Sequence, residues 1–362
     1  MITRRAALGL AGGFAACGLA PAGLRRSTGK RALWRNEGGP HLRGAVFVQR
    51  RVYPEVDGPS FLGPGPVGQP VTPDALSRLA DAGANLASWS GPGIFAESPP
   101  FSIDAAIEDH VGAWLDACRS RGLFTTLCLR TGPGRSAFAF HPDEGWYPQR
   151  LFDNSIWRGD DKQAAWAEMV AETLRRFGDH PACAGVVAMD EPNGADAGHD
   201  GVWPGFAARI ASACEGLDKG APLIFSPDRW ARTERAGELR RAVGPGPVMA
   251  VHDYDPWDFT HQAEGAQRTY RREADAIVLP QSANGDWAML EFGAVNAAPG
   301  LPDYLEDRIS AFEAAGANWA VFRWTSGWTE YEAVEGGMAV SEHPRALAVL
   351  RRAWARNTVR PA

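Results

Sequence analysis

The 362-residue sequence predicts an α/β protein, a single (β/α)8 barrel that occupies residues 40–362. After residue 40, eight short apolar runs alternate with eight longer amphipathic runs. The apolar runs are nearly continuous, which is typical of parallel strands covered on both faces. The longest connections follow apolar runs, at residues 50–72, 131–159 and 326–344, and such connections build the active-site face of a barrel. A doubly wound open sheet is the alternative, but it usually has fewer strands, and no Gly-x-Gly-x-x-Gly sequence follows the first strand.

The alternation predicts each element in turn. We expect strands at residues 44–49, 84–90, 123–130, 183–191, 222–227, 247–254, 286–293 and 317–325. We expect helices at residues 73–82, 104–121, 160–178, 203–216, 233–243, 262–275, 303–315 and 345–356. Thr72 followed by Pro73 predicts the start of the first helix, with a side-chain cap and a proline at the first helical position. Gly83, Gly122 and Gly316 each follow a helix, where a left-handed residue is favoured.

Residues 1–22 predict an export signal, followed by a lead-in at residues 23–39. Two adjacent arginines precede a weakly apolar stretch rich in Gly and Ala, which resembles a twin-arginine signal. Residues 14–18 also resemble a lipobox, in which Cys17 would carry a lipid anchor. We therefore expect an exported protein, periplasmic or secreted, with a simple basic start before a helix as the alternative.

The composition excludes several functional classes. A formal net charge of −6 and the absence of a basic run argue against nucleic-acid binding. No apolar stretch after the signal reaches the ~20 residues that a helix needs to cross a bilayer. Fourteen tryptophans predict an unusually aromatic core or cleft. The remaining cysteines lie in apolar patterns without a Cys-x-x-Cys pair, which favours buried thiols over a zinc site: Cys118, Cys128, Cys183 and Cys214.

Two glutamates end predicted strands and are the candidate catalytic residues. Glu191 ends the fourth strand and Glu291 ends the seventh, each after an apolar run. A carboxylate at the rim of an apolar barrel is costly unless it is used or paired. Strands four and seven lie across the barrel mouth from each other. The two carboxyl groups can therefore approach the ~5–5.5 Å separation that glycoside hydrolysis with retention requires.

The strand ends also carry a family resemblance. Glu-Pro at Glu191 and Glu-Phe-Gly at Glu291 resemble the retaining (β/α)8 glycoside hydrolases, and most closely glycoside hydrolase family 5, the cellulase and mannanase family. The resemblance implies that Glu191 is the acid/base and Glu291 the nucleophile. His252 and Tyr254 match the family's His-x-Tyr, which contacts the substrate and the nucleophile. Trp324 matches the aromatic platform under the sugar at the cleavage point.

The sequence departs from the family at three places. Asp190 stands where the family has an Asn that bonds the sugar 2-hydroxyl, and Asp can accept from that hydroxyl but cannot donate to it. The family's Arg near the end of the second strand is missing from residues 84–90, and its usual His near the third or fourth strand is not evident. The segment around Arg130 instead resembles β-galactosidases of the same clan. We interpret the chain as a divergent member, with Asp190, Arg130 and Trp89 as further substrate-binding candidates.

Other chemistries fit the sequence less well. His252 and the aspartates after it suggest a metal site, but no second histidine-rich strand supplies more ligands, and we expect neither a metal nor a cofactor. A Schiff-base lysine is excluded, because Lys162 falls in a predicted helix and Lys219 precedes the fifth strand. We therefore expect a retaining glycosidase that acts on a β-linked glucan or mannan. A barrel that binds carbohydrate without cleaving it, and an exo-acting β-galactosidase-like enzyme, remain alternatives.

Overall fold

The computed structural model describes most of the chain after the predicted signal. The described residues are 29–57, 65–68, 71–142, 144–217, 220–263, 267–272, 277–280, 285–325 and 335–362. The predicted export signal, Cys17 and Lys219 lie outside them. None of the helices in the described part of the chain is long and apolar enough to cross a bilayer.

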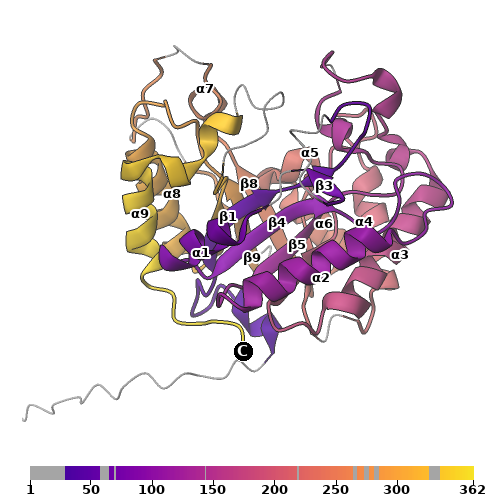
Figure 1. The fold of residues 1–362 in the computed structure, drawn as a ribbon, viewed down its shortest axis with the longest axis horizontal. Coiled ribbons are helices and arrows are strands. Elements are labelled where there is room, and N and C mark those ends of the chain that lie inside the picture. The colour runs from indigo at the N-terminus through magenta and orange to yellow at the C-terminus, as the bar shows by residue number, and fades with distance from the viewer. Residues whose placement is uncertain are drawn as a thin grey trace, which may run out of the picture.

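Eight parallel strands form a closed barrel, which confirms the predicted fold (Figure 1). The strands are β1 (Arg43–Val48), β4 (Leu86–Pro92), β5 (Thr125–Thr131), β6 (Cys183–Val187), β7 (Leu223–Phe225), β8 (Val248–Asp253), β9 (Trp287–Phe292) and β10 (Asn318–Val321). They pair in chain order, and β10 closes the barrel by pairing with β1. Nearly every strand residue is buried, as expected of strands enclosed between a packed interior and a layer of helices.

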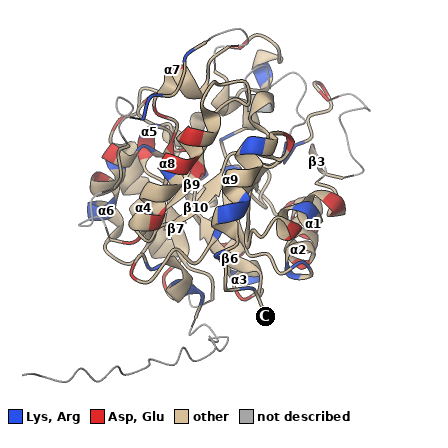
Figure 2. Cartoon of the chain, turned by 90° about the vertical axis from the view of Figure 1, so that its left-hand side faces the viewer, with Lys and Arg blue, Asp and Glu red and all other residues tan. Residues whose placement is uncertain are grey.

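The outer layer contains seven of the eight predicted helices: α1 (Pro73–Asp81), α2 (Ala105–Arg119), α3 (Asp160–Phe177), α4 (Val202–Ala213), α6 (Ala236–Val243), α8 (Leu301–Ala314) and α9 (Pro344–Trp354). The Thr72 side chain caps α1 by accepting from the Ala75 N–H. Gly83, Gly122 and Gly316 all have positive φ after their helices, as predicted. On the helices seen in Figure 2, Lys and Arg are interspersed with Asp and Glu.

The helix predicted at residues 262–275 is wrong, because the described residues of this range are not helical. A short helix, α7 (Trp257–Thr260), lies just before the range instead. Tyr270 is the only large apolar side chain in the range, which is too little for an amphipathic face. Tyr270 packs against Phe259 and Tyr304, and the Gln262 amide donates to the carbonyls of Phe259 and Arg268, so the described residues of this range pack without a helix.

Short elements decorate the connections. After β1, β2 (Arg50–Arg51) and β3 (Val67–Gly68) form a small antiparallel sheet, which the sequence did not predict. The helix α5 (Asp228–Ala231) follows β7. The 3-10 turns are Lys30–Trp34, Ala137–Phe140, Gln149–Leu151, Ser155–Trp157, Thr233–Arg235, Glu335–Met338 and Val340–Glu342. The burial predicted for the cysteines is confirmed for Cys118, Cys128, Cys183 and Cys214.

The two ends of the described chain cover the bottom of the barrel, where the strands begin. The Trp34 indole donates to the Ala184 carbonyl over 2.8 Å, and the Lys30 ammonium donates to two carbonyls near the start of β6. From the C-terminal side, the Asn85 amide just before β4 donates to the Val359 carbonyl over 3.1 Å. The opposite, carboxyl end of the strands carries the long connections and the candidate site.

Candidate active site

A sharp turn after β6 brings Asp190 and Glu191 to the barrel mouth together. Strand β6 ends at Val187, three residues before Asp190. Asp190 donates its N–H to the Leu129 carbonyl over 2.8 Å, and Glu191 takes a left-handed φ of 43°. The side-chain alternation of a strand, which would send these neighbours to opposite faces, therefore no longer applies.

A buried arginine that sequence reasoning missed holds this turn. The Arg135 guanidinium donates to the Asp190 carbonyl over 2.5 Å and to the Glu191 carbonyl over 2.7 Å. Burial lowers the pKa of Arg135 to about 10, so the group is still charged at neutral pH. Arg135 lies in a loop rich in Gly and Pro, where an arginine ordinarily suggests only an exposed side chain.

The two candidate catalytic carboxylates meet at one histidine. The Nδ1 atom of His252 is 2.9 Å from Oε1 of Glu191 and 3.5 Å from Oε2 of Glu291. Because both oxygens lie close to one imidazole nitrogen, the two carboxyl groups are near enough for the ~5–5.5 Å separation of a retaining pair. The Tyr254 hydroxyl donates to Oε2 of Glu291 over 2.9 Å. The structure thus brings together the four residues that the strand-end motifs single out.

The protons of this cluster are coupled. Burial raises the pKa of Glu291 to about 8, against the opposing effect of a charged His252. Burial disfavours a charged His252, but Glu291 and Glu191 outweigh it and raise the pKa of His252 to about 9. The site therefore retains dissociable protons near neutral pH, as a group rather than on one residue. A charged His252 favours the ionised form of Glu291, which is the form that can act as a nucleophile.

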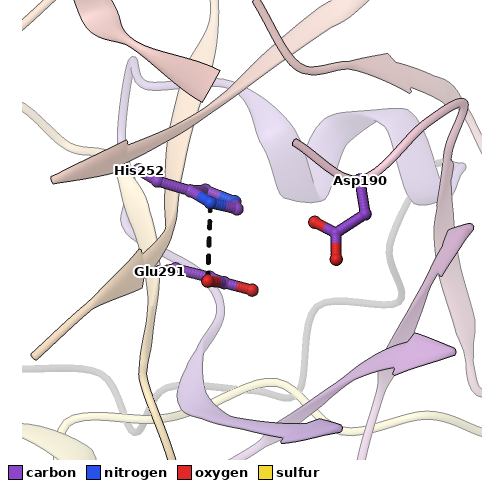
Figure 3. A group of neighbouring side chains, drawn as sticks. All are labelled: Asp190, His252 and Glu291. Atoms are coloured by element: carbon purple, nitrogen blue, oxygen red, sulfur yellow. Dashed lines mark ion pairs between the residues drawn. The ribbon is translucent and has the colours of Figure 1, made fainter. Parts of the chain in front are cut away.

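Asp190 forms a buried ion pair beside this cluster. Its Oδ2 accepts from the Ser90 hydroxyl over 2.6 Å and from the Arg130 guanidinium over 3.2 Å. Burial opposes ionisation of Asp190, but Arg130, His252 and the Ser90 hydroxyl together outweigh it and lower the pKa of Asp190. Its Oδ1 is buried and has no hydrogen-bond partner among the described residues. In Figure 3 the Asp190 carboxylate is directed toward His252 and Glu291, and Asp190 itself is fully buried.

A metal ion fits this arrangement poorly. Asp190, His252 and Glu291 each offer a potential ligand atom, all within 4.8 Å of one another (Figure 3). However, Arg130 lies 3.2 Å from the Asp190 carboxylate and already supplies a positive charge there. His252 is itself favoured as a cation by its carboxylate neighbours, and only a neutral imidazole binds a metal. These side chains form ion pairs instead, Arg130 with Asp190 and His252 with Glu291.

A cavity of about 330 Å³ opens over the two glutamates and has aromatic walls. Besides Tyr254, the aromatic lining residues are Phe140, Trp230, Trp257 and Phe322. Arg130 also lines the cavity, with its guanidinium 3.7 Å from the centre of the Phe140 ring. None of these four is among the substrate-binding residues predicted from the sequence, but Phe140 lies in the connection at residues 131–159, which is predicted to build the active-site face.

Two predicted sugar-binding residues lie elsewhere. Trp324 is only 2% exposed, donates its indole N–H to the Ala75 carbonyl and packs edge-on against Trp354. Trp89 is fully buried and donates to the Gln49 side chain. Neither Trp is among the described residues that line the cavity. Strand β10 ends at Val321, so its alternation does not carry as far as residue 324, and Phe322 is the residue of this segment that faces the site.

Trp230 reaches the cavity from a left-handed turn. Arg229, Trp230 and Ala231 have φ values of 58°, 62° and 60°, in a region that residues other than glycine rarely occupy. The Trp230 N–H donates to the Pro192 carbonyl next to Glu191, and the Asp228 carboxylate accepts from the N–H groups of Arg229 and Ala195. These bonds hold the turn against the connection that carries Glu191. Strain of this kind concentrates at ligand sites.

Known structures share this architecture. No family model matches the chain, and neither does any curated protein. A glycoside hydrolase of known structure superposes with a TM-score of 0.62 at 15% identity, over 86% of this chain and 99% of its own. The endoglucanase Cel5A of Pseudomonas stutzeri gives 0.60 at 16% identity, over 91% and 99%. Cel5A of Thermotoga maritima, in a complex with cellobiose, gives 0.58 at 14% identity, over 78% and 90%, and the same protein is also known with mannotriose.

These likenesses confirm, at low identity, the resemblance that the strand-end motifs predict. At 14–16% identity they show that this chain shares its barrel fold with endoglucanases of known structure.

Proposed function

We propose that the protein is a retaining glycoside hydrolase that cleaves a β-linked glucan- or mannan-type sugar. The observation that carries the proposal is the meeting of Glu191 and Glu291 at His252, at the mouth of a barrel whose structural neighbours are glycoside hydrolases. The cellobiose and mannotriose of the Thermotoga maritima complexes support the choice of sugar class.

In the first step, Glu291 attacks the anomeric carbon as the bond to the leaving sugar oxygen breaks. Glu191 donates its proton to that oxygen, so the leaving group departs as an alcohol. The hydroxyl of Tyr254 orients the Glu291 carboxylate through their 2.9 Å hydrogen bond. The product of this step is a glycosyl ester on Glu291 and an ionised Glu191.

In the second step, water replaces the ester. Glu191 takes a proton from the water, the water oxygen bonds to the anomeric carbon, and Glu291 leaves as a carboxylate. Both residues return to their starting protonation states. Arg135 keeps Glu191 in place by donating to its carbonyl oxygen.

The test is to trap the intermediate. The protein is incubated with 2-deoxy-2-fluoro-β-glucosyl fluoride and with its mannose counterpart, and intact mass and peptide mapping then locate any label. We expect the label on Glu291. A label on any other residue contradicts the assignment of the nucleophile.

Substitution of the acid/base gives a second, independent readout. Glu191→Ala should lower kcat for an unactivated oligosaccharide by about 10²–10⁴-fold, because the leaving group loses its proton donor. Azide should restore turnover of an activated aryl glycoside, since azide attacks the glycosyl ester without a base. Glu168→Ala, which changes an exposed glutamate on the outer helix α3, is the matched control. A protein that binds oligosaccharides but cleaves none would be the carbohydrate-binding barrel instead.

A further inference from the structure

A buried ion pair lies behind the candidate site, between the barrel and its outer layer of helices. Asp253 is the last residue of β8 and stands between His252 and Tyr254, which both reach Glu291. Side chains alternate along a strand, so Asp253 faces the helices while its two neighbours face the site. There it meets Arg308 of α8, with Oδ2 of the carboxylate 3.1 Å from Nη1 of a guanidinium that is 0% exposed. Burial raises the pKa of Asp253 and Arg308 counteracts the rise, so each charge of the pair depends on the other.

The pair fixes the chain on both sides of Tyr254. Before this residue, the Tyr304 hydroxyl donates to the Asp253 carbonyl over 3.4 Å. After it, Arg308 donates from its second terminal nitrogen to the Asp255 carbonyl. Oδ1 of Asp253 accepts from the Asp255 N–H over 3.0 Å. The backbone of Tyr254 is therefore held between two residues that both contact Arg308.

The same two strand–helix units are joined a second time on the side of the site. Helix α8 follows β9, the strand that carries Glu291, so Arg308 and Glu291 belong to one unit. Tyr254 belongs to the preceding unit, and its hydroxyl donates to Oε2 of Glu291 over 2.9 Å. The ion pair outside the barrel and this hydrogen bond at its mouth therefore link the same two units. A shift of the end of β8 against α8 would move the Tyr254 hydroxyl away from Glu291.

We propose that Asp253 and Arg308 are a pair of positioning residues, which hold the end of β8 so that the Tyr254 hydroxyl stays on Glu291. Neither is among the described residues that line the cavity, so they act through Tyr254 rather than on a substrate. By donating a hydrogen bond, Tyr254 favours the ionised form of Glu291. The consequence for catalysis rests on the proposed function, in which ionised Glu291 attacks the anomeric carbon, whereas the positioning itself does not.

The test measures the titration of Glu291 directly. The protein is labelled with ¹³C in the side-chain carboxyl groups of glutamate, and the Glu291 signal is identified by its loss in Glu291→Gln. The chemical shift of this signal is then followed against pH in wild type, Arg308→Met and Asp253→Asn. We expect the midpoint of its titration to rise by about one pH unit in both variants, because the Tyr254 hydroxyl is displaced. Asp253→Asn keeps an oxygen for the Asp255 N–H, so it is the milder variant and decides the test if Arg308→Met does not fold.

The two variants separate positioning from a direct effect of charge. Arg308→Met removes a positive charge and Asp253→Asn removes a negative one. A purely electrostatic effect would therefore raise the Glu291 midpoint in the first and lower it in the second, whereas loss of positioning raises it in both. Tyr254→Phe removes the hydroxyl itself, and in that background neither substitution should raise the midpoint further. The charged groups that face Glu291 in the site are the same in every variant: His252, Glu191, Asp190 and Arg130.

Arg43→Met is the matched control. Arg43 forms a similarly buried ion pair with Glu313 of the same helix α8, but at the end of the barrel where β1 begins, so its loss should leave the Glu291 midpoint unchanged. Arg308→Lys keeps the positive charge and should raise the midpoint less than Arg308→Met. An unchanged midpoint in the folded variants of the pair, midpoints that move in opposite directions, or a rise that persists in Tyr254→Phe overturns the proposal.

Activity gives a separate readout. The acid limb of the pH profile of kcat/KM should move upward together with the Glu291 midpoint, because only ionised Glu291 attacks. A wild-type protein that cleaves no β-linked glucan or mannan overturns the proposed function. The titration of Glu291 still decides the positioning role in that case, because it needs no substrate.

Discussion

The substitution of the family's usual Asn by Asp190 is compensated within the site by Arg130. Asp190 is fully buried, and the Arg130 guanidinium that pairs with it is almost fully buried. Removing one member of such a pair leaves the other charge uncompensated in a medium of low dielectric constant, which costs more than the pair itself contributes. Asp190 therefore belongs to a buried charge pair that an uncharged Asn at this position could not form.

Asp190→Asn should consequently destabilise the protein, although it restores the residue usual in the family. We expect the free energy of unfolding to fall by about 3 kcal/mol at neutral pH, measured by urea denaturation. The folded-state pKa of Asp190 lies below that of the unfolded chain, so its stabilisation is present above a pH of about 4 and is lost as the pH falls through the folded value. The difference in the free energy of unfolding between wild type and variant should therefore become smaller in acid.

A double-mutant cycle isolates the pair. Arg130→Met removes the partner charge and keeps an apolar stem against Phe140. The double variant Asp190→Asn with Arg130→Met should be more stable than the sum of the single effects implies, because neither charge is then left alone. Strictly additive effects would show that the two side chains do not stabilise each other.

Whether a site residue could be predicted from the sequence depends on whether a strand or an irregular connection positions its side chain. Glu191, Glu291, His252 and Tyr254 could be predicted because the ends of parallel strands meet at one face of a barrel, whatever the details of the loops. Trp324 could not be placed, because its side chain depends on how the chain leaves β10. Arg135, Phe140 and Trp257 come from irregular connections, where no periodicity relates a sequence position to a direction in space.

At the scale of the element, the strands were easier to predict than the helices around the site. All eight predicted strands exist, because each is an apolar run bounded by polar residues. The fourth was predicted to continue to Glu191, but it ends at Val187. The hydrophobic pattern continues through Met189, whereas the turn after it depends on hydrogen bonds to Arg135 that no local pattern encodes. The helix expected at 262–275 failed for another reason, because the range has a single large apolar side chain and cannot form an apolar helix face.

The left-handed turn at Asp228–Ala231 offers a test at this scale. Arg229 has φ 58° and an exposed side chain whose ion pair with Asp200 spans 4.0 Å. A non-glycine residue in this conformation destabilises the folded state by about 1–2 kcal/mol. Glycine removes this strain, but it also gives the unfolded chain more conformational entropy, which offsets part of the gain. Arg229→Gly should therefore raise the free energy of unfolding by about 0.5–1 kcal/mol.

Arg229→Ala is the matched control for this turn. It removes the same weak surface ion pair but keeps a Cβ atom in the left-handed region, so it should not stabilise the protein. Urea denaturation of both variants measures the difference. Equal stabilities of the Gly and Ala variants would mean that the turn carries no strain at this position.

At the scale of the whole molecule, the candidate site lies at one end of the barrel and the two ends of the described chain pack at the other. The site lies at the carboxyl ends of the strands, whereas the two ends of the described chain close the other face. After α9, residues 357–362 run beneath β1 and β4. Asn357 exchanges hydrogen bonds with Arg43 and donates to the Gly83 carbonyl, and Arg360 donates to the carbonyls of Ala84 and Gly122.

Deletion of residues 357–362 should thus weaken the fold without altering the site. The segment has the composition of a frayed end, yet it satisfies backbone carbonyls just before β4 and β5, and each such hydrogen bond contributes about 0.5–1.5 kcal/mol. We expect the free energy of unfolding to fall by about 2 kcal/mol in urea denaturation. Deletion of residues 361–362 alone keeps Asn357 and Arg360, and should change it little. Because the deleted segment lies at the end of the barrel opposite Glu191 and Glu291, kcat/KM of the folded protein should be the same in both deletions. A deletion of 357–362 as stable as the shorter one would show that the barrel closes without its C-terminal segment.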